Sequence, residues 1–389
     1  MINIAHKEDC CGCGACISAC PRKCIVFASD EEGFLYPYIN AKDCIDCHLC
    51  ERICPIINNN VESKIPTAYG CLGNDTIRMK SSSGGVFTLL SEYVIQRGGI
   101  VFGAKFDNSW HLIHDNVDSL DDLDSLRRSK YVQSNIHGCF QHVKYYLEKN
   151  KIVLFSGTPC QISGLQCYLG KEYESLFLVD VICHGVPSPY VWEKYLRESI
   201  DRVCNIANTP KKSVKVTDVN FREKTNGWRK YNISIKFDIG NEEYVERENI
   251  YKNMYMKFFL DNITLRPSCY NCKFRNQKSG SDITLGDFWG CENFFQDDDK
   301  GISLVLLNTD KGKSLFSNIR KVSIIPVDFN EVVPYNKSLQ FSYKRPLFRN
   351  RFFLLSRFFS LNRIYNYYIG KSNIIEKLAF HTLFLLFRK

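Results

Sequence analysis

The chain lacks the long apolar runs that membrane proteins carry. No stretch of its 389 residues reaches the roughly eighteen uninterrupted apolar residues that a membrane span needs. No apolar secretion segment stands at its start, and its 19 cysteines then indicate a reducing compartment, where thiols bind metals instead of forming disulfides. We therefore expect a cytoplasmic location.

Acidic residues are almost absent from the last part of the chain. From Phe341 to Lys389, ten Lys and Arg stand against the single acid Glu376, and the difference, 10 − 1 = +9, equals the formal net charge of the whole chain. The body is therefore near neutral and the basic excess belongs to the tail. The basic residues Arg345, Arg349, Arg351, Arg357 and Arg363 are interleaved with Phe348, Phe352, Phe353, Phe358 and Phe359, and the apolar stretch 374–387 follows.

Three interpretations fit this tail, which we predict to be a basic, aromatic, helical segment over residues 336–389. It can lie on an anionic membrane surface, here the inner one, or dock onto an acidic partner. It can also be a packed pair of carboxyl-terminal helices, because apolar stripes usually belong to a core. The near-neutral body offers no extended basic face, which argues against nucleic acid as a partner.

Cysteine is concentrated in the first 55 residues, in two runs of the form C-x2-C-x2-C-x3-C-P. Three thiolates at this spacing bind one iron-sulfur cube, and the fourth, next to proline, binds the neighbouring cube. We expect two [4Fe-4S] clusters, as in a bacterial two-cluster ferredoxin, which this segment resembles. The predicted sets are Cys10, Cys13, Cys16 with Cys54, and Cys44, Cys47, Cys50 with Cys20.

A four-cysteine zinc module is the alternative for these runs, but such modules normally space their C-x2-C pairs well apart in sequence. Cys11 and Cys24 fall outside both runs, and we expect them to be bystanders.

The length of the chain exceeds what one core usually supports, so several domains are expected. We predict an α+β multidomain protein: a two-cluster ferredoxin-like domain followed by a mixed α/β body and the basic helical tail. The predicted boundaries are residues 1–58 for the ferredoxin domain, 59–64 for a linker, 65–150 and 151–335 for two parts of the body, and 336–389 for the tail.

The first part of the body contains a Ser/Gly-rich turn that leads into an amphipathic helix. The turn is residues 81–85, and apolar residues at helical spacing predict the helix over 86–96. Unpaired N–H groups at such a helix start suit a phosphate; alternatively Ser83 is simply the N-cap. Strands over 68–73 and 100–106, an acidic loop over 115–124 and a helix over 136–148 are also expected.

The second part begins with a strand, helix and strand over 152–155, 161–169 and 176–182, which we expect to be a parallel unit. Cys160 and Cys183 follow the ends of the two strands, where ligands gather in α/β sheets. The pair Cys269 and Cys272 lacks partners nearby, so the four cysteines predict a third metal site. The spacing alone fits [4Fe-4S] and zinc equally well, with Cys291 as a competing ligand.

Residues 213–221, 231–237 and 243–248 alternate like an antiparallel meander. The loop between the first two strands carries Arg222, Lys224 and Trp228, which fit either an anion-binding substrate site or a solvated hairpin tip.

Six motifs in one order resemble a known family. From about Ile65 to Leu315, the chain is similar to the family of coenzyme F420 hydrogenase/dehydrogenase β subunits, flavin and iron-sulfur oxidoreductases whose relatives include chlorophyll-pathway reductases. The amino-terminal ferredoxin unit resembles the bacterial branch associated with polysaccharide-synthesis genes. The motifs are SSSGGVFTLL (81–90), SKYVQS (129–134), GTPCQ (157–161), CHGVPS (183–188), CYNC (269–272) and DITLGDFWG (282–290).

The resemblance implies an FAD and favours [4Fe-4S] over zinc on Cys160, Cys183, Cys269 and Cys272. The FAD-binding residues that it implies are Ser83, Gly84, Gly85, Lys130, Gln133, Gly286 and Asp287. His184, beside Cys183, is a candidate proton donor, with a structural role as the alternative.

The expected function is an oxidoreductase that takes single electrons from a soluble donor through the clusters to FAD, which exchanges a hydride with an unidentified small molecule. A role in surface-polysaccharide biosynthesis is expected. The alternative is a non-catalytic subunit that relays electrons between a partner enzyme and a carrier such as coenzyme F420 or ferredoxin.

Overall fold

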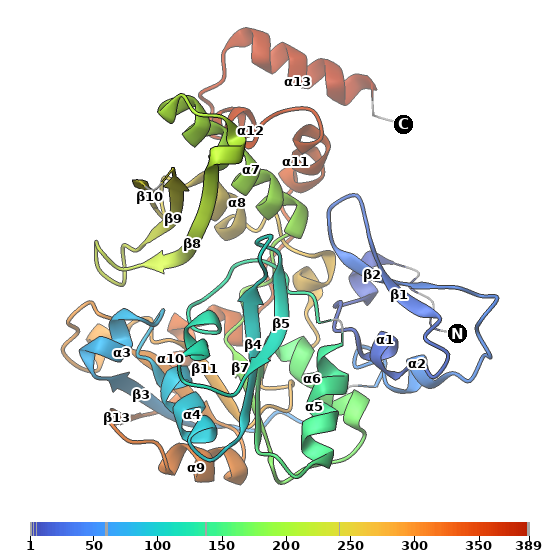
Figure 1. The fold of residues 1–389 in the computed structure, drawn as a ribbon, viewed down its shortest axis with the longest axis vertical. Helices are drawn as coiled ribbons and strands as arrows, with labels where there is room; N and C mark the ends of the chain where they lie inside the picture. Colours follow the sequence, from blue (N-terminus) through green and yellow to red (C-terminus); the bar gives the residue numbers. More distant parts are fainter. Residues whose placement is uncertain are drawn as a thin grey trace.

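An eight-stranded mixed sheet forms the centre of the computed structural model, which describes residues 2, 4, 6–58, 61–136, 138–240 and 242–386 (Figure 1). The strand order is β13-β3-β12-β11-β7-β6-β4-β5. The four strands β4, β6, β7 and β11 run parallel to one another, and the remaining pairs are antiparallel. Their bounds are β3 Thr67–Gly73, β4 Ile100–Phe106, β5 Leu112–Val117, β6 Val153–Gly157, β7 Leu176–Val181, β11 Ile283–Asp287, β12 Ser303–Leu307 and β13 Val322–Val327.

Helices cover this sheet, and those predicted from apolar periodicity are present. The helix expected over 86–96 is α4, Val86–Ile95, and the one expected over 161–169 is α6, Pro159–Leu169. The unit β6-α6-β7 is parallel, as predicted. The other helices around the sheet are α3 Asp75–Met79, α5 Cys139–Glu148, α9 Asp310–Ser317 and α10 Phe329–Val332.

The acidic loop predicted over 115–124 is wrong at its start. Asp115 lies in β5, where Lys105 of the paired strand β4 binds its carboxylate at 2.7 Å. The cross-strand ion pair allows an acidic residue inside a strand. The helix expected from residue 136 begins at Cys139 instead, because Gly138 before it is in the left-handed region, with φ of +77°.

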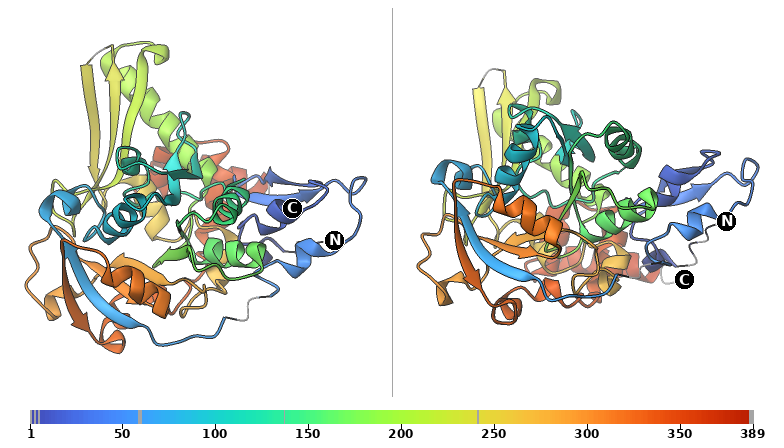
Figure 2. Two further views of the ribbon diagram at one scale, coloured as in Figure 1. Left: turned by 60° about the horizontal axis from the view of Figure 1, so that its bottom comes forward. Right: turned by 90° about the horizontal axis from the view of Figure 1, so that it is seen from below.

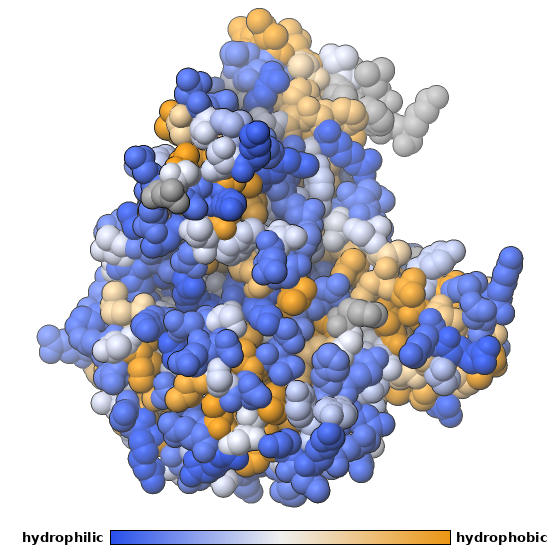
Figure 3. Space-filling view, in the orientation of Figure 1, coloured by the Kyte–Doolittle hydropathy of each residue, from blue (hydrophilic) through white to orange (hydrophobic). Residues whose placement is uncertain are grey.

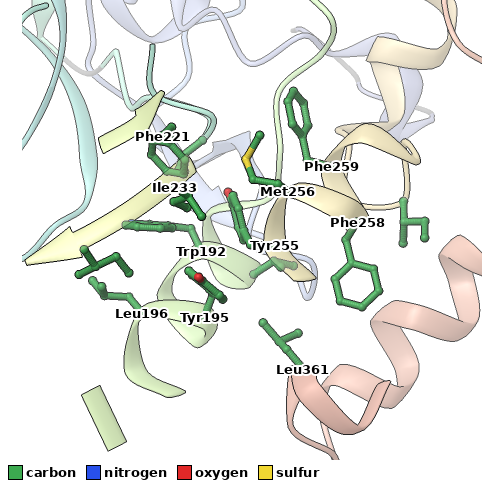
Figure 4. Packing of buried hydrophobic residues seen from close by; sticks show 14 of the residues in the cluster. Trp192, Tyr195, Leu196, Phe221, Ile233, Tyr255, Met256, Phe258, Phe259 and Leu361 are labelled. Atoms are coloured by element: carbon green, nitrogen blue, oxygen red, sulfur yellow. The ribbon is translucent and has the colours of Figure 1, made fainter. Parts of the chain in front are cut away.

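A second unit stands above the large sheet and holds an aromatic core (Figure 4). Its three-stranded antiparallel sheet, in the order β10-β9-β8, is the predicted meander. Trp192, Phe221 and Tyr255 are almost fully buried there and pack against Phe352 and Leu361 of the tail. The bounds are β8 Val214–Glu223, β9 Asn232–Ile239, β10 Glu242–Asn249, α7 Pro189–Ala207, α8 Met254–Leu260, α11 Phe348–Ser356, α12 Leu361–Tyr368 and α13 Ile374–Leu386.

The packed helix pair, one of three interpretations of the tail, therefore describes α11 and α12. Helix α13 projects at the top of the molecule, and Figure 3 shows apolar surface gathered in that region. Ile374, Ile375 and Leu378 are exposed apolar side chains of this helix. Residues 387–389 of the predicted tail, like residues 59 and 60 of the predicted linker, lie outside the described residues.

The amino-terminal unit lies beside α5 and α6 (Figures 1 and 2). It contains the hairpin of β1, Ile25–Ser29, and β2, Leu35–Ile39, together with α1, Ala15–Ala19, and α2, Leu49–Arg52. Arg349 of α11 is buried and forms an ion pair with Glu32 in the turn of this hairpin, at 2.5 Å. Across the described residues, no helix is both long and apolar enough to span a membrane.

Candidate functional site

The structure brings the second predicted cysteine set together at the outer end of the amino-terminal unit. Cys20, Cys44, Cys47 and Cys50 line a cavity of about 370 Å³, counting the space open to solvent. Cys47 is exposed, so this site reaches the surface. Cys24, predicted to be a bystander, lies in the same cavity with its sulfur 3.4 Å from that of Cys20.

The other set of this unit faces the body of the protein. Burial raises the pKa of Cys16 to about 12, and the nearby thiols of Cys10 and Cys54 act in the same direction. Helix α6 passes so close to this site that a Cβ atom on Gly164 would lie only 2.7 Å from Cys13 Cβ. Because Gly164 has no side chain, helix α6 can approach Cys13 this closely.

The third predicted set, Cys160, Cys183, Cys269 and Cys272, lines one cavity of about 770 Å³, counting the space open to solvent. Cys160 stands in the first turn of α6, and Cys183 follows β7. Cys269 lies in the short helical segment Pro267–Asn271, which Cys272 ends. Burial raises the pKa of Cys269 to about 12 and raises the pKa of Cys183 as well. Since metal ligands must be thiolates, a bound cluster has to replace these protons.

Two cysteines near the third site differ from expectation. Cys11, predicted to be a bystander, lines the third cavity, and its hydrogen bond with Cys160 raises the pKa of the Cys160 thiol well above its ordinary value. Cys291, predicted to compete as a ligand, is instead buried in a separate core with Phe288 and does not line this cavity. In the part of the chain that the structure describes, no three His, Cys, Asp or Glu side chains are arranged to hold one metal ion. Four thiolates that each bind a different iron of one cube need no such close approach.

A large cleft lies between the eight-stranded sheet and the second unit, with a volume of about 2130 Å³ counting the space open to solvent. Five of the residues predicted to bind FAD line it: Ser83, Gly85, Lys130, Gly286 and Asp287.

Gly84 and Gln133 do not line the cleft. Gly84 packs so tightly that an added Cβ would lie 2.1 Å from the carbonyl oxygen of Cys71. Gln133 donates to the Cys11 carbonyl at 3.4 Å and accepts from Arg266 at 2.9 Å, so it contacts the cysteine loop instead.

The groups that face the cleft fit an anionic ligand. The N-cap of α4 is Gly85, with no side-chain hydrogen bond to the helix start, whereas Ser83 Oγ donates to the Ile302 carbonyl at 2.7 Å. The N-cap alternative for Ser83 is therefore wrong, and the N–H groups at the start of α4 have no side-chain cap. Lys130 lies inside the same cleft, where burial lowers its pKa to about 7. These donors fit the phosphates of a dinucleotide such as FAD.

Of the three residues predicted to bind substrate, only Arg222 reaches the cleft. It is buried, forms an ion pair with Asp287 at 2.6 Å and stacks over the ring of Tyr231 at 4.0 Å. Its Nε and Nη2 atoms have no hydrogen-bond partner among the described residues.

Lys224 and Trp228 support the wall behind Arg222. Lys224 Nζ donates to the carbonyls of Arg78, Ser83 and Lys300, and Trp228 is fully buried, stacked on Trp289 with ring centroids 4.9 Å apart. Lys224 and Trp228 therefore do not line the cleft, and their burial does not fit a solvated hairpin tip. Substrate binding stays a prediction, with Arg222 as the residue of the three that reaches the cleft.

Two aromatic residues beside Arg222, Tyr231 and Trp289, also line the cleft and were not predicted as site residues. Trp289 belongs to the motif DITLGDFWG and follows the end of β11, which was a usable signal. Tyr231 is contributed by tertiary packing and had no such signal.

His184 lies in the cleft but is poorly suited to donate protons. Its Nε2 is 2.7 Å from Asn262 Oδ1, an acceptor, and its ring packs against Tyr343. Burial lowers its pKa to about 4, so the ring is neutral at pH 7. These contacts match the structural alternative.

The third cysteine cavity and the cleft share a wall. The residues that line both are Val181, Ile182, Cys183, Gly185, Val186 and Ser338. Because Cys11 lines the third cavity from the other side, the cysteine-rich unit, the third cysteine set and the cleft follow one another in space.

Two known protein domains match parts of this chain. Residues 9–57 match the 4Fe-4S dicluster domain, and residues 150–329 match the C terminus of the beta subunit of coenzyme F420 hydrogenase/dehydrogenase. The F subunit of the F420H2 dehydrogenase of Methanosarcina mazei is 23% identical over 191 residues, 46% of this chain and 54% of that protein. An uncharacterized ferredoxin of Methanocaldococcus jannaschii is 36% identical over 52 residues, 13% of this chain and 66% of that protein.

The match to the dehydrogenase protein spans about half the length of that relative. A solved structure of the F420-reducing [NiFe] hydrogenase complex from Methanosarcina barkeri aligns with a TM-score of 0.43 and 19% identity, over 71% of this chain and 91% of that chain.

The fold and the sequence matches define an iron-sulfur protein with an amino-terminal 4Fe-4S dicluster domain. Residues 150–329 of its body match the carboxyl-terminal domain of coenzyme F420 hydrogenase/dehydrogenase β subunits, and the chain is related to that family through this domain.

Proposed function

We propose that this protein is an iron-sulfur flavoprotein oxidoreductase that passes electrons between a soluble donor and a substrate bound in the cleft. The two ferredoxin-type sites would each hold a [4Fe-4S] cluster, and Cys160, Cys183, Cys269 and Cys272 a third. Ser83, Gly85, Lys130, Gly286 and Asp287 would hold the FAD. When bound, the clusters carry single electrons and the flavin exchanges electron pairs with a substrate as a hydride.

The observation that carries the proposal is the position of the third cysteine set between the other two sites. Its cavity is lined by Cys11 of the dicluster domain, and Cys183 lines both this cavity and the cleft. Helix α6 supports this order, because Cys160 lies in its first turn and Gly164 packs on Cys13 one turn later. A route inward from the exposed Cys47 follows from this arrangement.

The cleft favours an enzyme over a simple relay. Beside the predicted flavin residues it is lined by Arg222, Tyr231 and Trp289, a cation with two aromatic rings, which suits a small anionic or ring-containing molecule. The relay remains the second candidate, because the matched F420H2 dehydrogenase protein is itself named a subunit. A role in surface-polysaccharide biosynthesis and the use of coenzyme F420 both stay predictions.

Metal and flavin analysis of anaerobically purified protein tests the proposal. About twelve irons and one FAD per chain are expected, because three cubes of four irons are needed. In Cys160→Ser the iron content is expected to fall toward about eight, since the third cube loses one of its four thiolates. Cys291→Ser removes a buried thiol outside the cavity and should retain the full iron content.

A wild-type protein with about eight irons, one zinc and no FAD would contradict the proposal. An unchanged iron content in Cys160→Ser would contradict the assignment of the third set.

A further inference from the structure

Three of the five buried arginines have a carboxylate partner. Arg78 pairs with Asp298 at 2.5 Å, Arg222 with Asp287 at 2.6 Å, and Arg349 with Glu32 at 2.5 Å. Such pairing is expected, because a buried charge is costly unless a group of opposite charge compensates it. An arginine cannot avoid the cost by losing its proton.

Arg266 and Arg275 are buried as well, but no carboxylate among the described residues forms an ion pair with either of them. Arg266 donates to the carbonyls of Cys10 and Leu35, at 2.8 and 3.0 Å, and to Gln133. Arg275 donates to the carbonyls of Cys183, His184 and Ser338. All these acceptors are uncharged, so the hydrogen bonds orient the two guanidinium groups without neutralising them.

Arg275 lies against the third cysteine set, whereas Arg266 lies between the Cys10 loop and Cys269 of that set. Arg275 lines the cavity of this set. Arg266 is wedged under the amino-terminal cysteine loop, where a Cβ atom on Gly12 would lie 3.0 Å from its Cζ. Arg275 donates to the carbonyl of the predicted ligand Cys183, and the backbone carbonyl of Arg266 accepts from the N–H of the predicted ligand Cys269 at 2.9 Å. With no carboxylate paired to either guanidinium, a thiolate-bound cluster would supply the compensating negative charge.

We propose that Arg266 and Arg275 are the counter-charges of the third site and hold the reduction potential of its cluster above that of the outer ferredoxin cluster. This inference rests on the proposed function. Reduction adds a negative charge, and a fixed positive charge in a low-dielectric interior stabilises the reduced form. Near the outer set, Arg22 lines the cavity and Arg52 donates to the Cys47 carbonyl, but both are exposed, so solvent and salt screen them. The potential of the third cluster, next to the cleft, then lies above that of the outer cluster at the surface.

Redox titrations followed by electron paramagnetic resonance test the assignment on anaerobically purified, full-length protein. Arg275→Gln removes the charge and should lower the midpoint potential of the third cluster. We expect the ratio of reduced to oxidised cluster at a fixed potential to fall about tenfold, or about 59 mV for a one-electron couple. Arg275→Lys keeps the charge and should restore most of the shift.

Lys273→Gln is the matched control, because it removes an exposed positive charge next to the same ligand, Cys272. It should leave the potential within the error of the titration.

Two results would overturn the inference while about twelve irons remain bound, the number that three cubes hold. One is a shift in Arg275→Gln no larger than that in Lys273→Gln. The other needs no variant: a wild-type third cluster with a lower potential than the outer cluster. If the proposed function itself is wrong, the wild-type protein would contain about eight irons and would show no paramagnetic resonance signal from a third cluster.

Discussion

Two lysines, the buried Lys224 and the half-buried Lys130, have no carboxylate ion pair among the described residues. Burial lowers the pKa of each to about 7, from the ordinary value of 10.5. Both donate to backbone carbonyls, Lys130 to those of Arg127 and Arg128. A lysine with a lowered pKa can release its proton near neutral pH, whereas Arg266 and Arg275 stay charged and need neighbouring anions.

The lowered pKa of Lys130 predicts a pH dependence of stability. Between about pH 7 and pH 10.5 the unfolded chain binds a proton at this lysine that the folded chain does not, so the free energy of unfolding rises with pH. Each such lysine contributes up to about 1.4 kcal/mol per pH unit. In Lys130→Met this contribution is absent, while that of Lys224 remains.

The effect is measured as the difference in free energy of unfolding between wild type and Lys130→Met at pH 7, 8 and 9. Groups that titrate alike in both proteins cancel in this difference. The free energy of unfolding of wild type minus that of Lys130→Met should rise with pH. Lys215→Met removes an exposed lysine, and the corresponding difference from wild type should not change with pH. Parallel curves for wild type and Lys130→Met would show that Lys130 keeps its proton in the folded protein.

Helix α11 connects the tail to the amino-terminal unit through one buried ion pair. Arg349 is fully buried, contacts both carboxylate oxygens of Glu32 and also donates to the Leu265 carbonyl at 3.0 Å. The aromatic residues around it, Phe352 and Phe353, belong to the core of the second unit. The element therefore joins the hairpin β1–β2 to the body.

Arg349→Met should weaken this attachment strongly. Removing one partner of a buried pair leaves the other charge uncompensated, which typically costs about 3–5 kcal/mol. We expect faster amide hydrogen exchange in β1, β2 and α11, measured by mass spectrometry, with little change in β8–β10. Arg357→Gln removes an exposed charge just after the same helix and is the control. Equal exchange in wild type and Arg349→Met would mean that the pair does not hold the two parts together.

Elements with a local signal were predictable from the sequence. Cys20, Cys44, Cys47 and Cys50 were predicted to share one site, and they line one cavity because most of their spacing is fixed by the chain itself. The parallel unit β6-α6-β7 followed from apolar runs and the turn at Thr158 and Pro159.

Contacts made only in the folded molecule were not predictable. The placement of Gln133 depends on Arg266, which is 133 residues away in the sequence. The burial of Trp228 depends on its stacking with Trp289. The same limit explains Cys11, whose neighbour Cys160 lies far along the chain and meets it only when the dicluster domain packs against α6.

At the scale of the whole molecule, the basic excess is divided between buried and exposed positions. The buried Arg349 cannot face a membrane, which corrects part of the predicted pattern of interleaved basic and aromatic residues. The exposed share includes Arg351, Arg357 and Lys371, and the projecting helix α13 adds the apolar residues Ile374, Ile375 and Leu378. Peripheral membrane contact therefore stays a prediction for α13 and its basic surroundings only.

Co-sedimentation of the full chain with lipid vesicles tests this prediction. Apolar anchors and cations together bind an anionic surface, at about 1 kcal/mol for each Lys or Arg near it. We therefore expect the protein to bind vesicles that contain phosphatidylglycerol and to dissociate from them at high salt. It should not bind vesicles of phosphatidylcholine alone.

Replacing Ile374, Ile375 and Leu378 by serine should abolish this binding. Ile206→Ser, which changes an apolar residue of α7 that is 63% exposed, should not affect it. If the triple variant binds as wild type does, or if wild type binds neither kind of vesicle, α13 has no membrane role. Its exposed apolar face would then have to be covered by a protein, consistent with docking onto an acidic partner, the remaining interpretation of the tail.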